Sequence, residues 1–356
     1  MRVRQSLYVL EGTNPREYVF IFTNTRRIKK YRLNALAEKV LLYTIKNKEV
    51  AEADLIREFT GTKEELLEAV QQLLNAGILV EDESKLFSED YYQRYKRQIS
   101  FLGELSTSAE ETKVLQEKLK NARVVVFGVG GVGTWIVNGL SQIGIGEIAI
   151  VDPDTIEVSN LNRQLSFTTK DIGRHKVDVM KEKLPDSNII AYKKKVSKTE
   201  DLTEIIKGAS IVINCADNPS VEETTRVISR YCNKYKIPYS IAGGYNMHLG
   251  MLGPIIIPGE TACFECFLAA QKERDSLRDL KKLKDIEQTG SLGPIAGMIA
   301  NFHVMEVLKF LIGKGTINKN KFAELDFMDF GITWLTFDKH KDCKCNKSLR
   351  EAPNSN

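Results

Sequence analysis

The chain has 356 residues, a length that at roughly 150 residues per domain predicts about two domains. Hydrophobic residues make up 42% of the chain and charged residues 28%, ordinary values for a folded protein, so the composition excludes a disordered chain and a small disulfide scaffold. The 51 Lys and Arg against 47 Asp and Glu leave a net charge of +4, too small to indicate a nucleic-acid or membrane surface over the whole molecule.

No run of the sequence approaches the ~20 consecutive apolar residues of a membrane helix. The first residues contain acidic side chains where a signal peptide would have an unbroken apolar core. We therefore expect a cytoplasmic protein whose partners include neither a membrane nor a nucleic acid. The cysteine spacing is consistent with this location, because two close pairs of cysteines in a long intracellular chain indicate metal ligands rather than disulfides.

The first 80 residues have the pattern of a small module of strands and helices. The expected strands are short β-type runs at 7–10, 18–22 and 78–80. The expected helices begin at the capping residues Asn34 and Thr62, with a shorter helix over 51–59 between them. Strands with three helices in so short a length predict a winged-helix-like domain.

The acidic, turn-prone segment 81–84 predicts a linker, because it cannot contribute to a hydrophobic core. From about residue 120 onward, strand and helix patterns alternate, which predicts parallel crossovers and a doubly wound, Rossmann-like α/β sheet. We therefore expect two domains, residues 1–88 and residues 89–356.

A glycine-rich turn follows the expected strand at 124–127, and a helix follows the turn. Its glycines, which would let the backbone approach a phosphate at the helix N-terminus, are Gly128, Gly130, Gly131 and Gly133. Asp152 ends the next strand, where a carboxylate can accept hydrogen bonds from a ribose. This pattern alone fits a mononucleotide as well as a nicotinamide or flavin dinucleotide.

Later motifs favour a nucleoside triphosphate with Mg²⁺. Arg163 lies in the run Asn-Leu-Asn-Arg-Gln at 160–164, Lys176 follows a short way on, and Asp217 comes just after a further strand. Two cations and a carboxylate suit a triphosphate and its metal better than the single pyrophosphate of NAD.

These motifs, in this order and spacing, resemble the ThiF/MoeB/MccB superfamily, the bacterial relatives of ubiquitin-activating enzymes, over about residues 90–345. Its members are ATP-dependent adenylyltransferases that activate a carboxyl terminus. The resemblance implies a nucleotide site in which Asp152 holds the ribose, Asp217 holds Mg²⁺, and the phosphates are held by Asn160, Arg163 and Lys176. Gln164 belongs to the same site, and Arg163, Lys176 and Asp217 are its implied catalytic residues. The resemblance also implies that segments 245–248 and 291–294 line the acyl pocket.

The segment 91–99 resembles the Arg-Tyr-x-Arg-Gln segment of MoeB-like members. There the second arginine reaches the ATP site of the partner subunit, so the resemblance implies a homodimer in which Arg97 is a catalytic residue acting in trans. The alternative is an exposed arginine on an amphipathic helix.

Four cysteines form two close pairs, Cys263 with Cys266 and Cys343 with Cys345. Four thiolates can close a tetrahedral structural Zn²⁺ site, with free thiols as the alternative. The superfamily usually has Cys-x-x-Cys at both places, so the Cys-x-Cys of the second pair departs from its pattern. Cys215 and Cys232 fall in a predicted strand and a predicted helix, so no thioester relay is expected.

The N-terminal module resembles the peptide-binding domain of MccB- and PaaA-type enzymes of ribosomal peptide natural product biosynthesis. The resemblance implies a small ribosomal precursor peptide as partner, bound as an added strand. Residues 1–32 carry eight Lys and Arg against two acidic residues, which would steer an acidic leader peptide there. A DNA-binding role is disfavoured because the polar face of the third helix is acidic.

We therefore expect ATP-dependent adenylation of a carboxylate on a precursor peptide in peptide antibiotic biosynthesis. The activated peptide would undergo either nucleotidyl transfer or cyclisation with loss of water. The main alternative is MoeB/ThiF-type adenylation of a ubiquitin-like sulfur carrier. An NAD-dependent oxidoreductase is disfavoured because the chain has no obvious hydride chemistry, and the presence of Arg163, Lys176 and Asp217 argues against a non-catalytic leader-binding protein.

Overall fold

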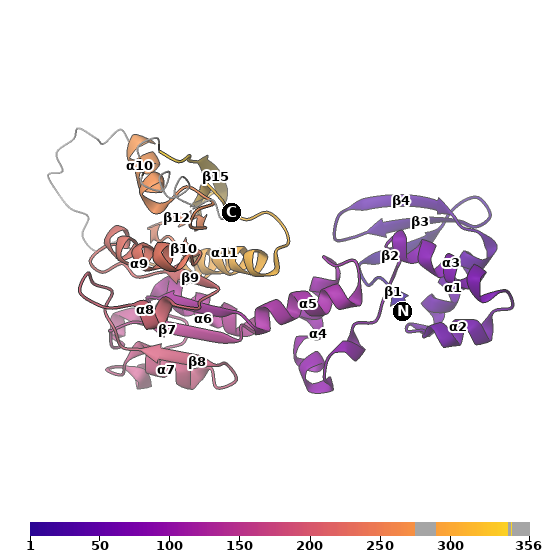
Figure 1. Cartoon of the computed structure of the whole chain (residues 1–356), viewed down its shortest axis with the longest axis horizontal. Coiled ribbons are helices and arrows are strands. Elements are labelled where there is room, and N and C mark those ends of the chain that lie inside the picture. Colours follow the sequence, from indigo (N-terminus) through magenta and orange to yellow (C-terminus); the bar gives the residue numbers. More distant parts are fainter. Residues whose placement is uncertain (275–289, 341–342, 344–356) are drawn as a thin grey trace, which may run out of the picture. The chain divides into compact units, whose positions relative to one another are not determined.

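The computed structural model describes residues 1–274, 290–340 and Cys343. Backbone contacts divide the chain into two compact units, Met1–Gln116 and Glu117–Asn356, whose elements are labelled in Figure 1. The division falls within helix α5 (Ala109–Lys120). The functional assignment of residues 1–88 to peptide binding and of 89–356 to adenylation stays a prediction.

The first unit contains an antiparallel sheet in the order β2 (Leu7–Glu11), β3 (Glu17–Phe22), β4 (Arg27–Arg32). A separate short pair joins β1 (Arg2–Val3) to β5 (Leu79–Val80). The helices are α1 (Ala35–Asn47), α2 (Glu52–Glu58), α3 (Lys63–Asn75) and α4 (Glu89–Gly103), with a 3₁₀ turn at Ser84–Leu86.

Both predicted helix caps in this unit are confirmed. The Asn34 side chain accepts a hydrogen bond from the backbone N–H of Ala37, and Thr62 forms a reciprocal capping box with Glu65. Strand β4 was not predicted, because its sequence Arg-Ile-Lys-Lys-Tyr-Arg lacks a run of apolar residues. Strand β4 forms because its backbone pairs with β3 along its whole length.

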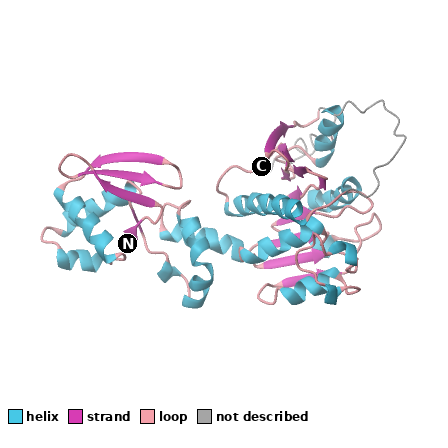
Figure 2. Cartoon of the chain, turned by 180° about the vertical axis from the view of Figure 1, so that it is seen from behind, coloured by secondary structure: helices cyan, strands magenta, loops and turns pink. Residues whose placement is uncertain are grey.

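The helices cover one face of the three-stranded sheet, as Figures 1 and 2 show. Tyr18 and Phe20 of β3 are buried there against Leu41 of α1 and Leu73 of α3. The strand period of two turns the intervening side chains to the other face, where Tyr8 and Ile28 are 63% and 67% exposed. The buried helical face holds this module together.

Ion pairs and hydrogen bonds tie the β-rich part of the unit to the segment around α4. The Glu104 carboxylate accepts hydrogen bonds from Arg4 (2.9 Å), Ser6 (2.7 Å) and Asn24 (2.6 Å). Arg2 pairs with the buried Glu83 at 2.8 Å. These contacts join residues about 80 to 100 positions apart in the sequence.

The second unit is built on a six-stranded sheet in the order β13-β10-β9-β6-β7-β8. Five strands are parallel, and β13 (Ile255–Ile256) pairs antiparallel at one edge. The parallel strands are β6 (Arg123–Phe127), β7 (Glu147–Val151), β8 (Ile189–Tyr192), β9 (Ile211–Asn214) and β10 (Tyr239–Ile241). The helices between them are α6 (Gly131–Gln142), α7 (Lys176–Lys183), α8 (Thr203–Ile206) and α9 (Val221–Tyr235), with 3₁₀ turns at Val158–Asn160 and Thr169–Asp171.

This topology confirms the predicted Rossmann-like α/β core. Strands β6, β7, β9 and β10 are almost fully buried, and successive residues such as Val124 and Val125 contribute to opposite faces of the sheet. Figure 2 shows helices on both sides of these strands. The strand order reverses between β6 and β9, and in such sheets the crevice at the carboxyl ends of the strands at this point is the usual ligand site.

A second, antiparallel sheet was not predicted from the sequence. Its order is β11 (Tyr245–Asn246), β12 (Leu249–Leu252), β14 (Lys321–Asp326), β15 (Gly331–Thr336). The helices of this region are α10 (Phe264–Arg274) and α11 (Gly293–Ile312). Gly250 of β12 allows the close approach of Ile299 on α11, because a Cβ at Gly250 would lie 2.6 Å from that side chain.

Helix α11 is long and apolar enough to cross a membrane by length and composition alone. It packs against α6 and β12, and 61% of its most apolar window is buried inside the protein. A core helix of a folded unit passes the same test, so this helix is weak evidence for a membrane span.

Candidate nucleotide site and cysteine cluster

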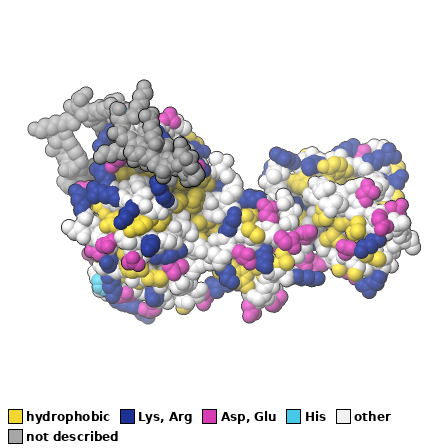
Figure 3. Space-filling model, viewed as in Figure 1, with side chains coloured by type: hydrophobic (Ala, Val, Ile, Leu, Met, Phe, Trp, Pro, Cys, Tyr) yellow, Lys and Arg dark blue, Asp and Glu magenta, His cyan; other side chains and the backbone are white. Residues whose placement is uncertain are grey.

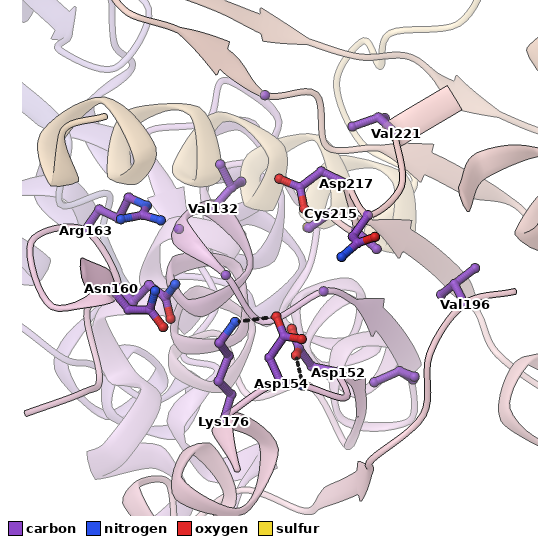
Figure 4. A pocket seen from close by; sticks show the side chains of 18 of the residues that line it. Val132, Asp152, Asp154, Asn160, Arg163, Lys176, Val196, Cys215, Asp217 and Val221 are labelled. Carbon is purple, nitrogen blue, oxygen red and sulfur yellow. Dashed lines mark hydrogen bonds and ion pairs between the residues drawn. The ribbon is translucent and has the colours of Figure 1, made fainter. Parts of the chain in front are cut away.

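A cavity of about 700 Å³ opens at the carboxyl ends of β6, β7 and β9, where the strand order reverses (Figure 4). Nine of the predicted nucleotide-site residues line it: Gly128, Gly130, Gly131, Asp152, Asn160, Arg163, Gln164, Lys176 and Asp217. Figure 4 shows Arg163, Asn160 and Lys176 on one side of the cavity and Asp217 on the other. The structure thus brings together side chains that are up to 65 residues apart in the sequence.

Gly133 is not among the residues that line the cavity, and its role is in packing. A Cβ at Gly133 would lie 1.9 Å from the carbonyl oxygen of Gly128. Gly128 itself has φ of +85°, and a Cβ there would lie 2.7 Å from the backbone nitrogen of Ala216. Glycine is therefore required at both positions for the turn to bring the N-terminus of α6 to the cavity.

Asp152 fixes the glycine-rich turn from the end of β7. The backbone N–H of Val129 donates to one carboxylate oxygen at 2.7 Å, and that of Asp154 donates to the other at 2.8 Å. Burial raises the pKa of Asp152. The charge of Lys176 and the two backbone N–H donors favour the ionised carboxylate and partly offset this rise. Each carboxylate oxygen retains a further acceptor position, so hydrogen bonding to a ribose remains compatible with these contacts.

Lys176 lies at the N-terminus of α7 and is almost fully buried. Its ammonium pairs with the carboxylate of Asp154 at 2.9 Å, the contact drawn as a dashed line in Figure 4. Asp154 was missed in the sequence analysis, since an acidic residue two positions after Asp152 carries no signal of its own. A buried cation at a cavity is suited to an anionic ligand.

The 160–164 run forms the wall of the cavity that carries Arg163. The Arg163 guanidinium donates to the carbonyl oxygen of Ser159 at 2.6 Å, and the indole N–H of Trp135 donates to the Arg163 carbonyl at 3.1 Å. Asn160 is buried and accepts from the backbone N–H of Glu157 at 3.1 Å. Among the described residues the buried side-chain oxygen of Gln164 has no hydrogen-bond partner.

A buried amide holds the loop that presents Asp217. The Asn214 side chain donates to the hydroxyl groups of Thr224 (3.0 Å) and Thr225 (2.8 Å) and accepts from the N–H of Ala216 (3.0 Å). Such a buried amide costs about 1–3 kcal/mol when left unpaired, so these bonds hold the loop in place. Within the described part of the chain no hydrogen bond or ion pair reaches the exposed carboxylate of Asp217.

The cavity also contains residues that the motifs did not single out. Lys194, Lys195 and Val196 follow β8 and line it together with Val221. Cys215 lines it as well, and its burial and the charge of Asp217 raise the pKa of the thiol, which therefore remains protonated at neutral pH. The lysines could have been found from their place directly after a strand of the parallel sheet.

The two segments implied for the acyl pocket each contribute to this cavity, through Tyr245 and Ser291. Arg97 is exposed on α4 in the first unit. Its role in trans stays a prediction.

Three of the four predicted metal ligands lie together. The sulfur atoms of Cys263, Cys266 and Cys343 all lie within 4.8 Å of one another, and Cys263 is 3.8 Å from Cys266 and 3.3 Å from Cys343. Cys345 lies outside the described residues. A tetrahedral site with Zn–S bonds of about 2.3 Å places its sulfur atoms about 3.8 Å apart, so the cluster could hold a metal ion such as Zn²⁺.

The model of the ThiF family matches residues 95–347. The sulfur carrier protein ThiS adenylyltransferase of Escherichia coli is 29% identical over 228 residues, 62% of this chain and 82% of that protein. The adenylyltransferase and sulfurtransferase UBA4 of Scheffersomyces stipitis is 30% identical over 275 residues, but this covers 72% of this chain and only 58% of UBA4.

Solved structures match over nearly the whole chain. MccB of E. coli with ATP has a TM-score of 0.70 at 20% identity, covering 97% of this chain and 98% of MccB. PaaA has a TM-score of 0.70 at 21% identity, covering 94% of this chain and 99% of PaaA. At these identities the likeness shows the fold alone. The family match shows more: this chain belongs to the ThiF family, a family of ATP-dependent adenylating enzymes.

Proposed function

We propose that this protein uses ATP to adenylate a carboxylate on a small ribosomal precursor peptide that the N-terminal unit binds. The observation that carries the proposal is the N-terminal unit itself, since the family match begins only at residue 95. MccB, whose fold matches this chain including that unit, has been solved with ATP and in complex with N-formylated MccA. An added binding unit fits a substrate too small to supply its own recognition surface.

The cavity supports the adenylation step by its charges. A substrate carboxylate oxygen would attack the α-phosphorus of ATP as the bond to the pyrophosphate breaks. Arg163, Lys176 and the N-terminus of α6 would hold the phosphates, and their fixed positive charge would stabilise the negative charge that develops. Asp152 would hold the ribose, Asn160 and Gln164 would contribute hydrogen bonds, and Val196 with Val221 would contact the base.

Mg²⁺ fits the side of the cavity that lies opposite Arg163 and Lys176. Asp217 offers a carboxylate oxygen, the ligand type that Mg²⁺ prefers, and no described cation neutralises it. Bound there, the ion would offset phosphate charge.

Strand β4 is the part of the N-terminal unit that best fits an extended peptide. Among the described strands it pairs only with β3, so its outer edge can accept main-chain hydrogen bonds. Arg27 and Arg32 at its ends are exposed. Figure 3 shows Lys and Arg side chains at both ends of the edge where β4 lies in Figure 1, with hydrophobic side chains between them. Such an edge suits an acidic peptide with apolar side chains.

A homodimer would give Arg97 access to a second active site. Apolar side chains on the second sheet offer a surface for a second copy of the chain: Ile332 and Trp334 share a face of β15 and are each 49% exposed, and the adjacent Met328 and Phe330 are 77% and 75% exposed. Contiguous exposed apolar side chains of this size are typical of interfaces.

Structural Zn²⁺ is the remaining cofactor that we propose. Cys263, Cys266, Cys343 and Cys345 would close the site, and the backbone N–H of His340, 3.2 Å from the Cys266 sulfur, would stabilise a thiolate. Such a site would fix the C-terminal segment to α10.

Adenylation of a sulfur-carrier protein is the second candidate, and the sequence relatives favour it. The E. coli relative is named for its action on the carrier ThiS. To decide, the protein is incubated with ATP and Mg²⁺ and either a precursor peptide encoded beside its gene or a carrier ending in Gly-Gly, and products are read by mass spectrometry. A nucleotide gained by the peptide, or water lost from it, supports the proposal; turnover of the carrier alone overturns it.

Asp217→Asn should abolish adenylation, because a neutral amide is a much weaker Mg²⁺ ligand than a carboxylate. The measurement is substrate-dependent ATP–pyrophosphate exchange over a Mg²⁺ titration, with Asp178→Asn as the matched control, a half-buried residue of α7 that pairs with Lys193 and does not line the cavity. Exchange at the wild-type rate and Mg²⁺ dependence would refute the assignment.

Reversing the charge at the ends of β4, with Arg27→Glu and Arg32→Glu together, should weaken binding of an acidic precursor peptide by at least tenfold and flatten its salt dependence. Fluorescence anisotropy with a labelled peptide measures both effects. Lys39→Glu with Lys46→Glu on α1 makes the same change in net charge away from this edge and should leave affinity nearly unchanged. Equal losses in the two double variants would point to a general charge effect instead.

Arg97→Ala should be inactive alone and regain activity when co-expressed with Asp217→Ala. Half of randomly paired dimers would contain one copy of each and hold one intact site, which gives about one quarter of the wild-type rate. The rate of purified mixed protein measures this. If mixing restores nothing while both variants remain dimeric in light scattering, Arg97 does not act across a dimer.

Cys263→Ser should remove the bound zinc, since one thiolate of four is lost. Metal content by mass spectrometry should fall from about one ion per chain to near zero, whereas Cys232→Ser, a buried core thiol outside the cluster, should keep its zinc. Wild-type protein purified without zinc or any other metal would disprove the centre.

A further inference from the structure

Two hydroxyl groups meet at the edge of the nucleotide cavity. Tyr245, on β11 of the second sheet, is hydrogen-bonded through its phenol to the side chain of Ser291, which precedes α11. Both residues line the cavity. The Tyr245 hydroxyl oxygen lies 3.5 Å from where a Cβ on Gly131 would lie, and the Arg163 side chain approaches the same point equally closely. The pair therefore lies beside the N-terminus of α6 and the expected phosphate ligands.

The Tyr245–Ser291 pair has one hydroxyl proton that its mutual hydrogen bond does not use. Two hydroxyl groups carry two protons, and their mutual hydrogen bond uses one of them. In the described part of the chain neither hydroxyl has another hydrogen-bond partner. The second proton is therefore available to a ligand in the cavity, and the pair is a neutral hydrogen-bond donor at its anion-binding end.

The pair is held by segments from three parts of the chain. The side chain of Asn162 donates to the carbonyl oxygen of Ser291 at 3.2 Å, and Gly293 leaves room for the Asn162 carbonyl, because a Cβ there would lie 2.9 Å from that oxygen. On the other side, Tyr245 pairs with Gly250 of β12. A donor fixed in this way needs little rearrangement when a ligand binds, which is the condition for effective electrostatic stabilisation.

We propose that the Tyr245–Ser291 pair binds the substrate carboxylate and positions it for attack on the α-phosphorus. The inference rests on carboxylate adenylation and applies to a peptide or a carrier protein alike. The pair would donate to one carboxylate oxygen while the other forms the new bond to phosphorus and the bond to pyrophosphate breaks. No proton is transferred in this step. A neutral donor suits the task, since a lysine or arginine in the same place would draw more electron density from the attacking group.

The phosphates are the less fitting ligand for this pair. Arg163, Lys176 and the N-terminus of α6 already supply positive charge to them, whereas Tyr245 and Ser291 are uncharged and come from the second sheet and the segment that enters α11. Binding of ATP alone should therefore be independent of the two hydroxyls, and the acyl substrate should depend on them.

Tyr245→Phe, which keeps the ring and removes the hydroxyl, tests this in the full-length protein, with Ser291→Ala as the second variant. We expect the kcat/KM for the acyl substrate in ATP–pyrophosphate exchange to fall about tenfold or more in each. The Kd for ATP, measured by calorimetry without acyl substrate, should stay within about twofold of wild type. Tyr231→Phe is the matched control, because it removes a hydrogen bond from a tyrosine hydroxyl to the Glu200 carbonyl outside the cavity. This variant should retain wild-type exchange.

The outcomes separate the possibilities. Wild-type exchange in both variants, or a loss of ATP affinity equal to the loss of exchange, would overturn the proposal. Circular dichroism identifies a variant that fails to fold, and Ser291→Ala then carries the test, since it leaves the Tyr245 ring in place. If the wild-type protein exchanges with a carrier and not with a peptide, the peptide proposal fails, and the same variants are tested with the carrier.

Discussion

The turn between β6 and α6 has no room for a side chain at its two critical glycines, and the rest of the site is arranged around it. A Cβ at Gly133 would meet the Gly128 carbonyl, and a Cβ at Gly128 would meet the backbone after β9. This contact brings the C-termini of two neighbouring strands and the N-terminus of a helix to one place. Asp152 then fixes the turn by accepting the N–H of Val129. The backbone thus supplies a site for an anion before any charged side chain is added.

Two of the cations and the Asp217 carboxylate lie on different walls of the cavity. Arg163 and Lys176 lie on one wall and Asp217 on the other (Figure 4). Lys176 is buried and pairs with Asp154, whose side chain is 60% exposed, so the ammonium is held in a fixed position at the cost of its desolvation. Because Asp217 has no described partner, this wall presents an uncompensated negative charge. A site divided in this way fits a ligand that combines phosphates with a cation.

Sequence reasoning was most successful where a residue type has one strong local role. Asn34 and Thr62 were predicted as helix caps, and the spacing of glycines, Asp152 and the 160–164 run indicated the Rossmann-like core and the residues of its cavity. It missed β4, whose residues are mostly charged, because pairing with β3 and not an apolar pattern makes it a strand. It also missed the second sheet. That sheet joins β11 and β12 to strands about 70 residues later in the sequence, and no local pattern encodes so distant a partner.

Glu104 gives the N-terminal unit a boundary that differs from the one its composition suggests. Its carboxylate accepts hydrogen bonds from Arg4, Ser6 and Asn24, so the start of the chain is bound to the residue after α4. This residue lies beyond the acidic segment 81–84, which was predicted as a linker but lies within the first unit. A chimera that exchanges only residues 1–80 with a homologue would not include Glu104, and the side chains that donate to its carboxylate would lose their hydrogen-bond partner. A transplanted unit that keeps these contacts therefore includes α4 and Glu104, the residue that follows it.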